Sequence, residues 1–167
     1  MYKIDDLVIY SGHGICKVDD ISEKTYAGVT RAYYVLSPIE NDNQLTISTP
    51  VDNSKKMIQN LMDKDEAANI LESFDSEGTD WIERPQLRSK VYHDILRSGI
   101  RSDIANVANT LLRKKHEIEM EGKKLSVQDG DILESIQDIL FRELSIVLKT
   151  PYEKIIGKVE QSLKKIS

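Results

Sequence analysis

LVIYSGHGICKVDDISEK, residues Leu7–Lys24, indicates how the N-terminal part of the chain folds. Two segments rich in Val and Ile, Leu7–Tyr10 and Gly14–Lys24, are separated by the turn-forming sequence SGHG. Such segments favour β-strands, and glycines in a short break between them favour a tight turn. Apolar and polar residues alternate, although imperfectly, in the second segment. The stretch therefore predicts two neighbouring antiparallel strands.

The same composition continues to about residue 50. Arg31–Ile39 (RAYYVLSPI) and Gln44–Pro50 (QLTISTP) are again rich in Val, Ile, Tyr and Thr, and turn-forming residues separate them from what precedes. Short strands at regular spacing predict a small antiparallel barrel or a strongly bent sheet. We place this β module at residues 1–55.

Beyond this point the hydrophobic period changes to that of helices. Helix-capping residues precede the apolar stripes and glycines follow them; the expected caps are Asp63, Ser102, Ser126 and Thr150 with Pro151, and the expected stops are Gly99 and Gly122. Strands first and helices afterwards predict an α+β chain with two segregated modules. The helical module is placed at residues 56–167.

The distribution of charge says more than the net charge of −5. Residues 1–80 hold 7 Lys/Arg and 15 Asp/Glu, whereas residues 81–116 hold 8 Lys/Arg and 3 Asp/Glu. A local basic block can bind phosphate even in an acidic protein. The alternative is a solvated helix face that happens to be basic.

Other sequence features predict a cytoplasmic protein. The start, MYKIDDL, lacks the basic and apolar regions of a signal peptide, and no apolar run reaches the ~18 residues of a membrane span. The single cysteine, Cys16, excludes an internal disulfide and fits a reducing compartment.

We find no enzyme signature. His13 and Cys16 lie three positions apart, a spacing that could suggest a catalytic or metal pair, but a turn between two strands explains it better. The three histidines are far apart, and Walker and Rossmann glycine patterns are absent. The sequence predicts no catalytic residue, no metal and no cofactor.

The lone tryptophan, Trp81, occupies a junction between an acidic break and a basic segment in SFDSEGTDWIERPQLRSK. If a helix runs from about Trp81 to Ser98, Arg84 and Arg88 share a face with the indole, and Lys90 lies nearby. An aromatic ring flanked by cations suits DNA, with the ring against the bases and the cations on phosphates. The alternative is a large core residue at the start of a helix.

Taken together, these motifs resemble the CarD-like (CarD/CdnL) family of bacterial transcription regulators. The resemblance is carried by LVIYSGHGICKVDDI, YYVL, LTISTPVDN, TDWIERPQLRSKVYHDILRSG and KKLSVQD, in this order along the chain. It implies a Tudor-like N-terminal domain that docks on the RNA polymerase β subunit and a helical domain that contacts promoter DNA.

The resemblance also implies site residues. The family's tryptophan enters the minor groove at the upstream edge of the transcription bubble and stabilises the open complex; it corresponds to Trp81, with Arg84, Arg88 and Lys90 as its basic neighbours. The polymerase-facing residues correspond to Lys24, Thr46, Ser48 and Pro50. Ser48 replaces a basic residue of the family, and Glu83 also departs from its pattern, so both contacts are expected to differ in detail.

Two further expectations concern partners. Binding to DNA alone is expected to be weak, salt-sensitive and largely non-specific, because the net charge is negative and no segment looks like a major-groove reading helix. The protein is expected to act as a monomer. An adaptor that joins two proteins and never touches DNA remains the alternative function.

Overall fold

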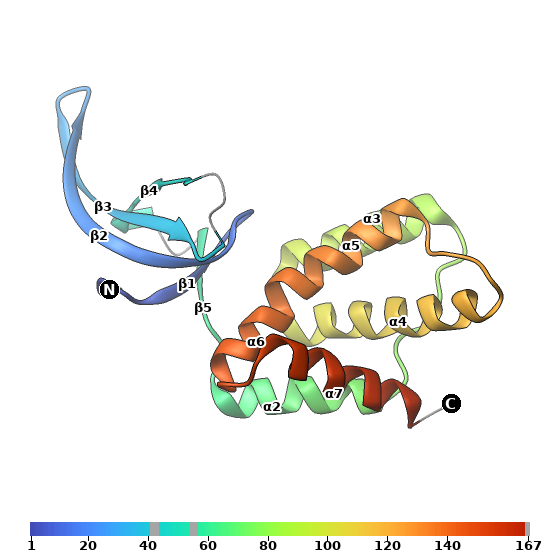
Figure 1. Ribbon diagram of the computed structural model, residues 1–167. Helices are drawn as coiled ribbons and strands as arrows, with labels where there is room; N and C mark the ends of the chain where they lie inside the picture. The colour runs from blue at the N-terminus through green and yellow to red at the C-terminus, as the bar shows by residue number, and fades with distance from the viewer. Residues whose placement is uncertain (41–43, 54–56, 166–167) are drawn as a thin grey trace. The chain divides into compact units, whose positions relative to one another are not determined.

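The computed structural model describes residues 1–40, 44–53 and 57–165, and the chain forms two compact units, Met1–Leu61 and Met62–Ser167 (Figure 1). The first unit is a β-sheet whose described strands are β1 (Leu7–Tyr10), β2 (Gly14–Tyr26), β3 (Val29–Pro38), β4 (Ile47–Pro50) and β5 (Ile58–Asn60). A short 3₁₀ turn, η1 (Val51–Asn53), follows β4.

These strands pair antiparallel in the order β4-β3-β2-β1-β5. The β2–β3 hairpin turns at Ala27 and Gly28, whose φ angles of 51° and 79° are left-handed and match the twist of a two-residue hairpin. A register shift between Val18 and Asp20 bends β2. The core beneath the sheet consists of Val8, Cys16, Val18, Tyr34, Leu36 and Ile58.

The fifth strand departs from the sequence expectation, which gave helical character to everything after the β module. β5 pairs with β1, and its Ile58 enters the core, so the sheet unit continues to Leu61. The expected boundary after residue 55 falls among residues 54–56, outside the described residues. A three-residue strand is too short to show a period in the sequence.

The second unit is helical. Its elements are α2 (Lys64–Glu72), the 3₁₀ turn η2 (Ser73–Asp75), α3 (Pro85–Ser98), α4 (Arg101–Met120), α5 (Val127–Ile136), the π-helical η3 (Gln137–Phe141), α6 (Arg142–Val147) and α7 (Tyr152–Lys164). α5, η3 and α6 follow one another without a break. Buried residues from all of these helices form one core, in which the rings of Phe74 and Phe141 meet edge to face.

Several expected helix ends are confirmed. The Asp63 side chain accepts a hydrogen bond from the Glu66 amide at 2.8 Å, and Ser126 accepts one from the Asp129 amide at 3.2 Å. Gly99 ends α3 in a left-handed conformation, with φ 70°.

Other expected ends are wrong. α3 begins at Pro85 and not at Trp81, because proline suits the first helical position and forces the residue before it into an extended conformation. Ser102 lies inside α4, whose N-cap is Ile100, and Pro151 rather than Thr150 precedes α7. The α+β class and the order of a β unit and a helical unit are confirmed.

Candidate nucleic-acid interface

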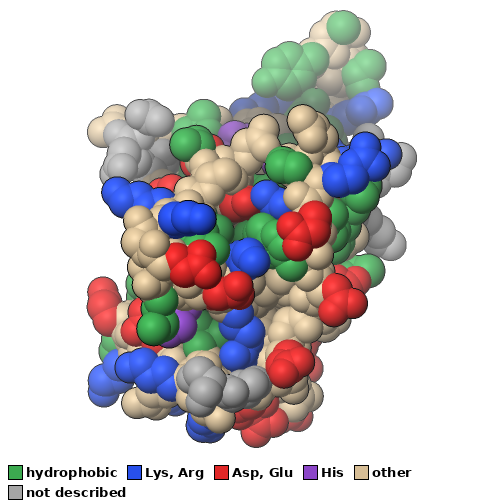
Figure 2. All heavy atoms as spheres, turned by 90° about the vertical axis from the view of Figure 1, so that its right-hand side faces the viewer, with side chains coloured by type: hydrophobic (Ala, Val, Ile, Leu, Met, Phe, Trp, Pro, Cys, Tyr) green, Lys and Arg blue, Asp and Glu red, His purple; other side chains and the backbone are tan. Residues whose placement is uncertain are grey.

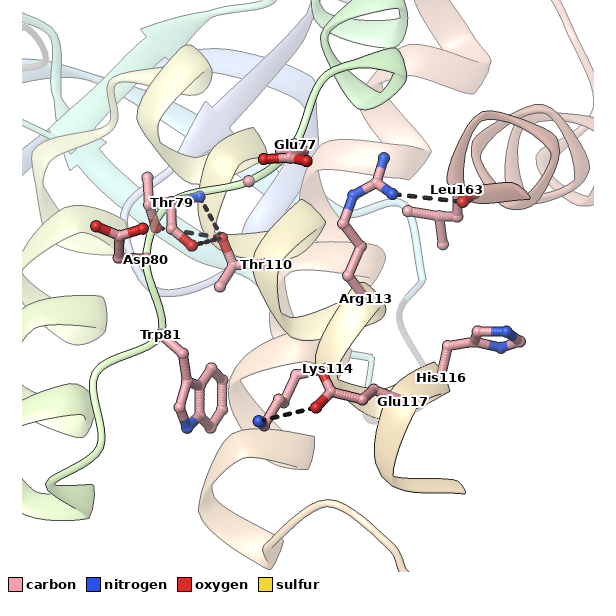
Figure 3. A pocket seen from close by; sticks show the side chains of 11 residues that line it. Glu77, Thr79, Asp80, Trp81, Thr110, Arg113, Lys114, His116, Glu117 and Leu163 are labelled. Atoms are coloured by element: carbon pink, nitrogen blue, oxygen red, sulfur yellow. Dashed lines mark hydrogen bonds and ion pairs between the residues drawn. The ribbon is translucent and has the colours of Figure 1, made fainter. Parts of the chain in front are cut away.

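Trp81 lies on the loop of residues 76–84, which connects η2 to α3 and is fixed along α4. The Asn109 side chain donates to the carbonyl of Ser76 at 2.8 Å, and the hydroxyl of Thr110 accepts from the amide of Thr79 at 2.8 Å (Figure 3). Arg113 donates to the same Ser76 carbonyl at 3.1 Å. The first part of the loop, residues 76–79, is therefore held by one face of α4.

Gly78 brings the loop backbone into close contact with α4. A Cβ atom at this position would lie 2.8 Å from the amide nitrogen and 2.9 Å from the Cα of Thr110. Both are backbone atoms of a helix and cannot move aside. Glycine is therefore needed here for space.

The indole of Trp81 is half-buried, and cations from two helices lie over its ring. The Cζ of Arg88, on α3, is 4.2 Å from the ring centroid, and the Nζ of Lys114, on α4, is 5.2 Å from it. Lys114 also forms an ion pair with Glu117 at 3.5 Å. The ring packs against the helical core on one side and borders an open hollow of about 360 Å³ that Thr79, Arg113 and His116 also line (Figure 3).

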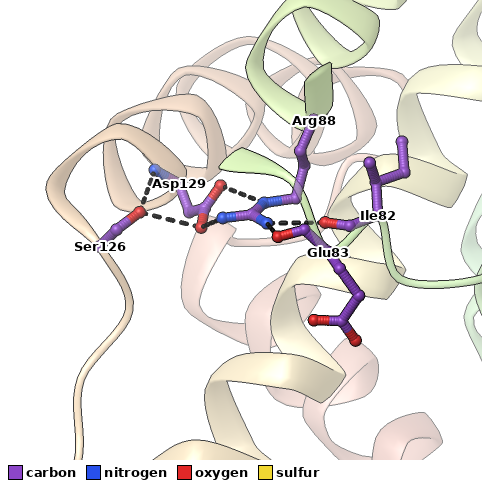
Figure 4. A network of polar contacts seen from close by, with 5 residues as sticks. All are labelled: Ile82, Glu83, Arg88, Ser126 and Asp129. Atoms are coloured by element: carbon purple, nitrogen blue, oxygen red, sulfur yellow. Dashed lines mark hydrogen bonds and ion pairs between the residues drawn. The ribbon is translucent and has the colours of Figure 1, made fainter. Parts of the chain in front are cut away.

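The spacing of Arg88 from Trp81 suggested that both side chains lie on a DNA-facing side. In the structure, however, the Arg88 side chain is buried. Its guanidinium binds both carboxylate oxygens of Asp129, at 2.9 Å from Nε and 2.7 Å from Nη2, and the two side chains are only 7% and 5% exposed (Figure 4). The remaining nitrogen, Nη1, donates to the carbonyl of Ile82 at 2.7 Å. Arg88 was predicted to bind phosphate together with Arg84 and Lys90; in the structure every guanidinium nitrogen instead has a partner inside the unit.

Arg84 and Lys90 are both exposed, as expected for cations that meet a polyanion. Arg84 is the extended N-cap residue of α3, and Lys90 lies within that helix. Trp81 precedes the helix, so the helical spacing from which a shared face was inferred does not apply to it.

In the sheet unit, Lys24 and Ser48 lie together. The Nζ of Lys24, on β2, donates to the Oγ of Ser48, on β4, at 2.7 Å, and lies 6.0 Å from the centroid of the Tyr33 ring on β3. Lys24 thus reaches across β3 to the edge strand. Thr46 is exposed just before β4, and Pro50, the last residue of β4, is half-buried.

Comparison with known proteins connects both units to one family. Residues 2–62 match the CarD-like/TRCF RID domain, and residues 66–160 match the CarD C-terminal domain. The chain belongs to the CarD family. A relative in Bacillus subtilis (strain 168), named "Putative transcription factor YdeB", is 24% identical over 150 residues, which cover 88% of this chain and 92% of that protein.

CarD family proteins are transcription factors without enzymatic activity, and the RID domain is an RNA-polymerase-interacting domain. The region around His13 fits this. The His13 ring stacks on Tyr10, with 5.7 Å between centroids, while Cys16 is fully buried. Burial, with a smaller contribution from Asp19, raises the pKa of the Cys16 thiol to about 11, so the thiol is protonated at neutral pH.

The described residues contain no group of three His, Cys, Asp or Glu side chains arranged to hold a metal ion. Within the same ranges, no helix is both long enough and apolar enough to cross a membrane.

Sequence reasoning missed two residues of this candidate site. Lys114 lies over the indole but comes from a different helix, and its charge looked like any other in the basic block. Asp129 falls within the segment KKLSVQD that carries the family resemblance, but the sequence does not indicate Arg88 as its partner. One signal was available: Asp129 stands third after a capping serine, a position whose side chain often turns back toward the helix start.

Proposed function

We propose that this CarD family member docks on the RNA polymerase β subunit through its N-terminal unit and stabilises the open promoter complex by placing Trp81 at the upstream edge of the transcription bubble. The observation that carries the proposal is the indole itself. It is half-exposed, on a loop whose preceding residues are hydrogen-bonded to α4, with Lys114 over its ring. An aromatic ring in that position suits insertion at an unstacked base step.

A wedge of this kind needs little energy to be effective. Stacking of a base on an aromatic ring contributes roughly 1–3 kcal/mol, and about 1.4 kcal/mol changes a lifetime tenfold. Arg84, Lys90 and Lys114 are the cations that we assign to the phosphates near the indole. Arg88 is removed from that set because it is buried.

DNA binding by this protein alone is proposed to be weak and largely non-specific. Of the 8 Lys/Arg in residues 81–116, Arg88 and Arg101 form buried ion pairs and Arg113 binds backbone carbonyls. On the face of the helical unit turned to the viewer in Figure 2, basic and acidic side chains are interspersed. With about three phosphate contacts, the slope of log K against log salt should be near −3; a slope of −6 or steeper would contradict this.

Docking on polymerase is assigned to the surface of Lys24, Thr46, Ser48 and Pro50. Because Lys24 already donates to Ser48, its charge is held at the β4 edge, where a carboxylate of the partner could bind it. We propose that the protein acts there as a monomer, in the cytoplasm and at the nucleoid through polymerase. Co-purification of the β subunit with the wild type, and its reduction by Lys24→Ala, tests this assignment.

Replacing the indole tests the proposed function. Trp81→Ala should shorten the lifetime of open promoter complexes about tenfold or more, while polymerase binding persists, because the indole and the polymerase-facing residues lie in separate units. Met120→Ala, which truncates a 77% exposed apolar side chain elsewhere in the same unit, is the matched control and should leave the lifetime unchanged. If Trp81→Ala melts far below the wild type and also loses polymerase binding, Trp81 is a core residue and the proposal fails.

A further inference from the structure

The guanidinium of Arg88 contacts both the ring of Trp81 and the backbone that follows it. Its Cζ lies 4.2 Å from the indole centroid, and its Nη1 donates to the carbonyls of Ile82 at 2.7 Å and Glu83 at 3.5 Å. These are the two residues immediately after Trp81. One side chain therefore restrains the indole and the peptide segment that carries it.

Arg88 is in turn fixed by α5. Asp129 binds two of its nitrogens in the bidentate geometry that suits a planar guanidinium. The hydroxyl of Ser126, the N-cap of α5, donates to the second oxygen of Asp129 at 2.9 Å and accepts from its amide (Figure 4). The contacts run from the start of α5 through Asp129 and Arg88 to the loop. We call Ser126, Asp129 and Arg88 the Arg88 network.

Burial makes this arrangement rigid. Both the Arg88 guanidinium and the Asp129 carboxylate are more than nine-tenths buried. If they separated, each charge would lose its partner without gaining contact with water, so separation is unfavourable. The fork geometry also defines the plane of the guanidinium, and a ring stacked on a fixed plane has few orientations left.

We propose that Arg88 and Asp129 are positioning residues that hold the Trp81 indole in one orientation before DNA is present. This deepens the proposed function and rests on it. A wedge that samples several orientations is competent for only a fraction of the time, and its apparent effect declines by that fraction. The Arg88 network removes this loss without contacting DNA itself.

Fluorescence can test this directly, because Trp81 is the only tryptophan in the chain. In the full-length protein, Arg88→Lys keeps the positive charge but loses the planar fork, and Asp129→Asn loses the charge that holds the fork. Both variants should show faster depolarisation of the Trp81 emission and stronger quenching by acrylamide than the wild type. Ser126→Ala, a milder change to the same network, should shift both readouts in the same direction but less.

The open-complex lifetime should follow the mobility of the indole. If the competent orientation falls to about a third to a tenth of the population in Arg88→Lys, the stabilisation of open complexes should fall about three- to tenfold. Polymerase binding should not change, because Arg88 lies in the helical unit and the polymerase-facing residues lie in the sheet unit.

A second buried ion pair in the same unit provides the matched control. Arg101 binds Glu143 at 2.8 Å, and the two side chains are 11% and 1% exposed. Arg101 is the first residue of α4, 13 residues before Lys114, the α4 residue that lies over the indole. Arg101→Lys is therefore the same change in a comparable environment. It should lower the melting temperature about as much as Arg88→Lys but leave Trp81 depolarisation, quenching and open-complex lifetime as in the wild type, at a temperature where both variants are folded.

The outcomes separate this inference from the proposed function. Wild-type depolarisation and quenching in folded Arg88→Lys and Asp129→Asn would overturn the positioning role. The same holds if the indole becomes mobile in Arg101→Lys as well, since the effect would then follow from lost stability. If Trp81→Ala leaves the lifetime unchanged, the proposed function fails, and the fluorescence of the Arg88 variants still decides whether the network holds the indole.

Discussion

Burial of Cys16 suppresses the ionisation of its thiol, and with it the reactivity of that group. Its side chain lies in the sheet core, and burial, followed by the charge of Asp19, raises the pKa of its thiol to about 11. In the unfolded chain the thiol ionises near its ordinary value of 9.0. Between these two values the unfolded state binds fewer protons than the folded state, so stability falls as the pH rises through this window.

This difference predicts a specific pH dependence of stability. From about pH 8 to about pH 10.5, the free energy of unfolding of the wild type should decrease more than that of Cys16→Ala, which lacks the titrating thiol. Urea unfolding of both proteins at the two pH values measures the difference, and the titration of Lys and Tyr residues is common to both. An equal decrease in the two proteins would show that the thiol has the same pKa in both states.

Arg88 marks the limit of what a sequence can say about one residue. The two side chains do lie together, with the Cζ of Arg88 4.2 Å from the indole centroid, but not through the helical spacing that predicted it, since Trp81 precedes α3. Spacing also cannot say which of the two side chains faces solvent. That depends on Asp129, which lies far along the chain and meets Arg88 only because α5 packs beside α3. Arg84 and Lys90 are both exposed, as cations that bind phosphates need to be.

At the scale of elements, the position of the loop of residues 76–84 depends on the close contact between Gly78 and α4. Gly78→Ala would place a methyl group against the backbone of Thr110 and should cost about 1–3 kcal/mol in the free energy of unfolding. Because the shifted segment leads directly to Trp81, quenching of the indole by acrylamide should also increase. Urea unfolding and tryptophan fluorescence of the variant measure the two effects.

At Gly130, a change to alanine should have the opposite effect on stability from the same change at Gly78. It lies within α5, and a Cβ atom there would have no neighbour within 4 Å. Gly130→Ala should therefore stabilise the protein by about 0.5–1 kcal/mol, since alanine loses less backbone entropy in a helix. If both variants were destabilised equally, the contact between Gly78 and Thr110 would not be the cause.

Element boundaries were predictable where one residue sets them locally. Asp63, Ser126 and Gly99 do so through a cap or a left-handed φ, and the structure confirms each. The start of α3 was misjudged although Pro85 marks it, because the apolar character of Trp81 and Ile82 resembled the first turn of the helix. β5 was not predictable, since what holds it is pairing with β1.

At the scale of the whole molecule, the two units differ in fold but hardly in net charge. Residues 1–61 hold 6 Lys/Arg and 8 Asp/Glu, and residues 62–167 hold 17 Lys/Arg and 20 Asp/Glu, so the net charges are −2 and −3. The basic block of residues 81–116 is therefore a local feature of the helical unit. Each unit has its own buried core, so each can be studied by itself when its limits are kept.

The limits of the sheet unit lead to the final prediction. A fragment of residues 1–61 keeps β5, whose residues pair with Val8, Ile9 and Tyr10 of β1, whereas a fragment of residues 1–55 exposes the β1 edge. The shorter fragment also loses the buried Ile58, a loss comparable to large-to-small core substitutions that cost about 2–5 kcal/mol. A unit of about 60 residues has little stability to spare.

The longer fragment should unfold cooperatively and bind the polymerase β subunit, while the shorter one should melt at a much lower temperature or show no transition. Thermal unfolding followed by circular dichroism, with β-subunit binding measured beside it, compares them. Equal melting of the two fragments would mean that β5 adds nothing to the sheet, and a folded but non-binding 1–61 fragment would remove polymerase docking from this unit.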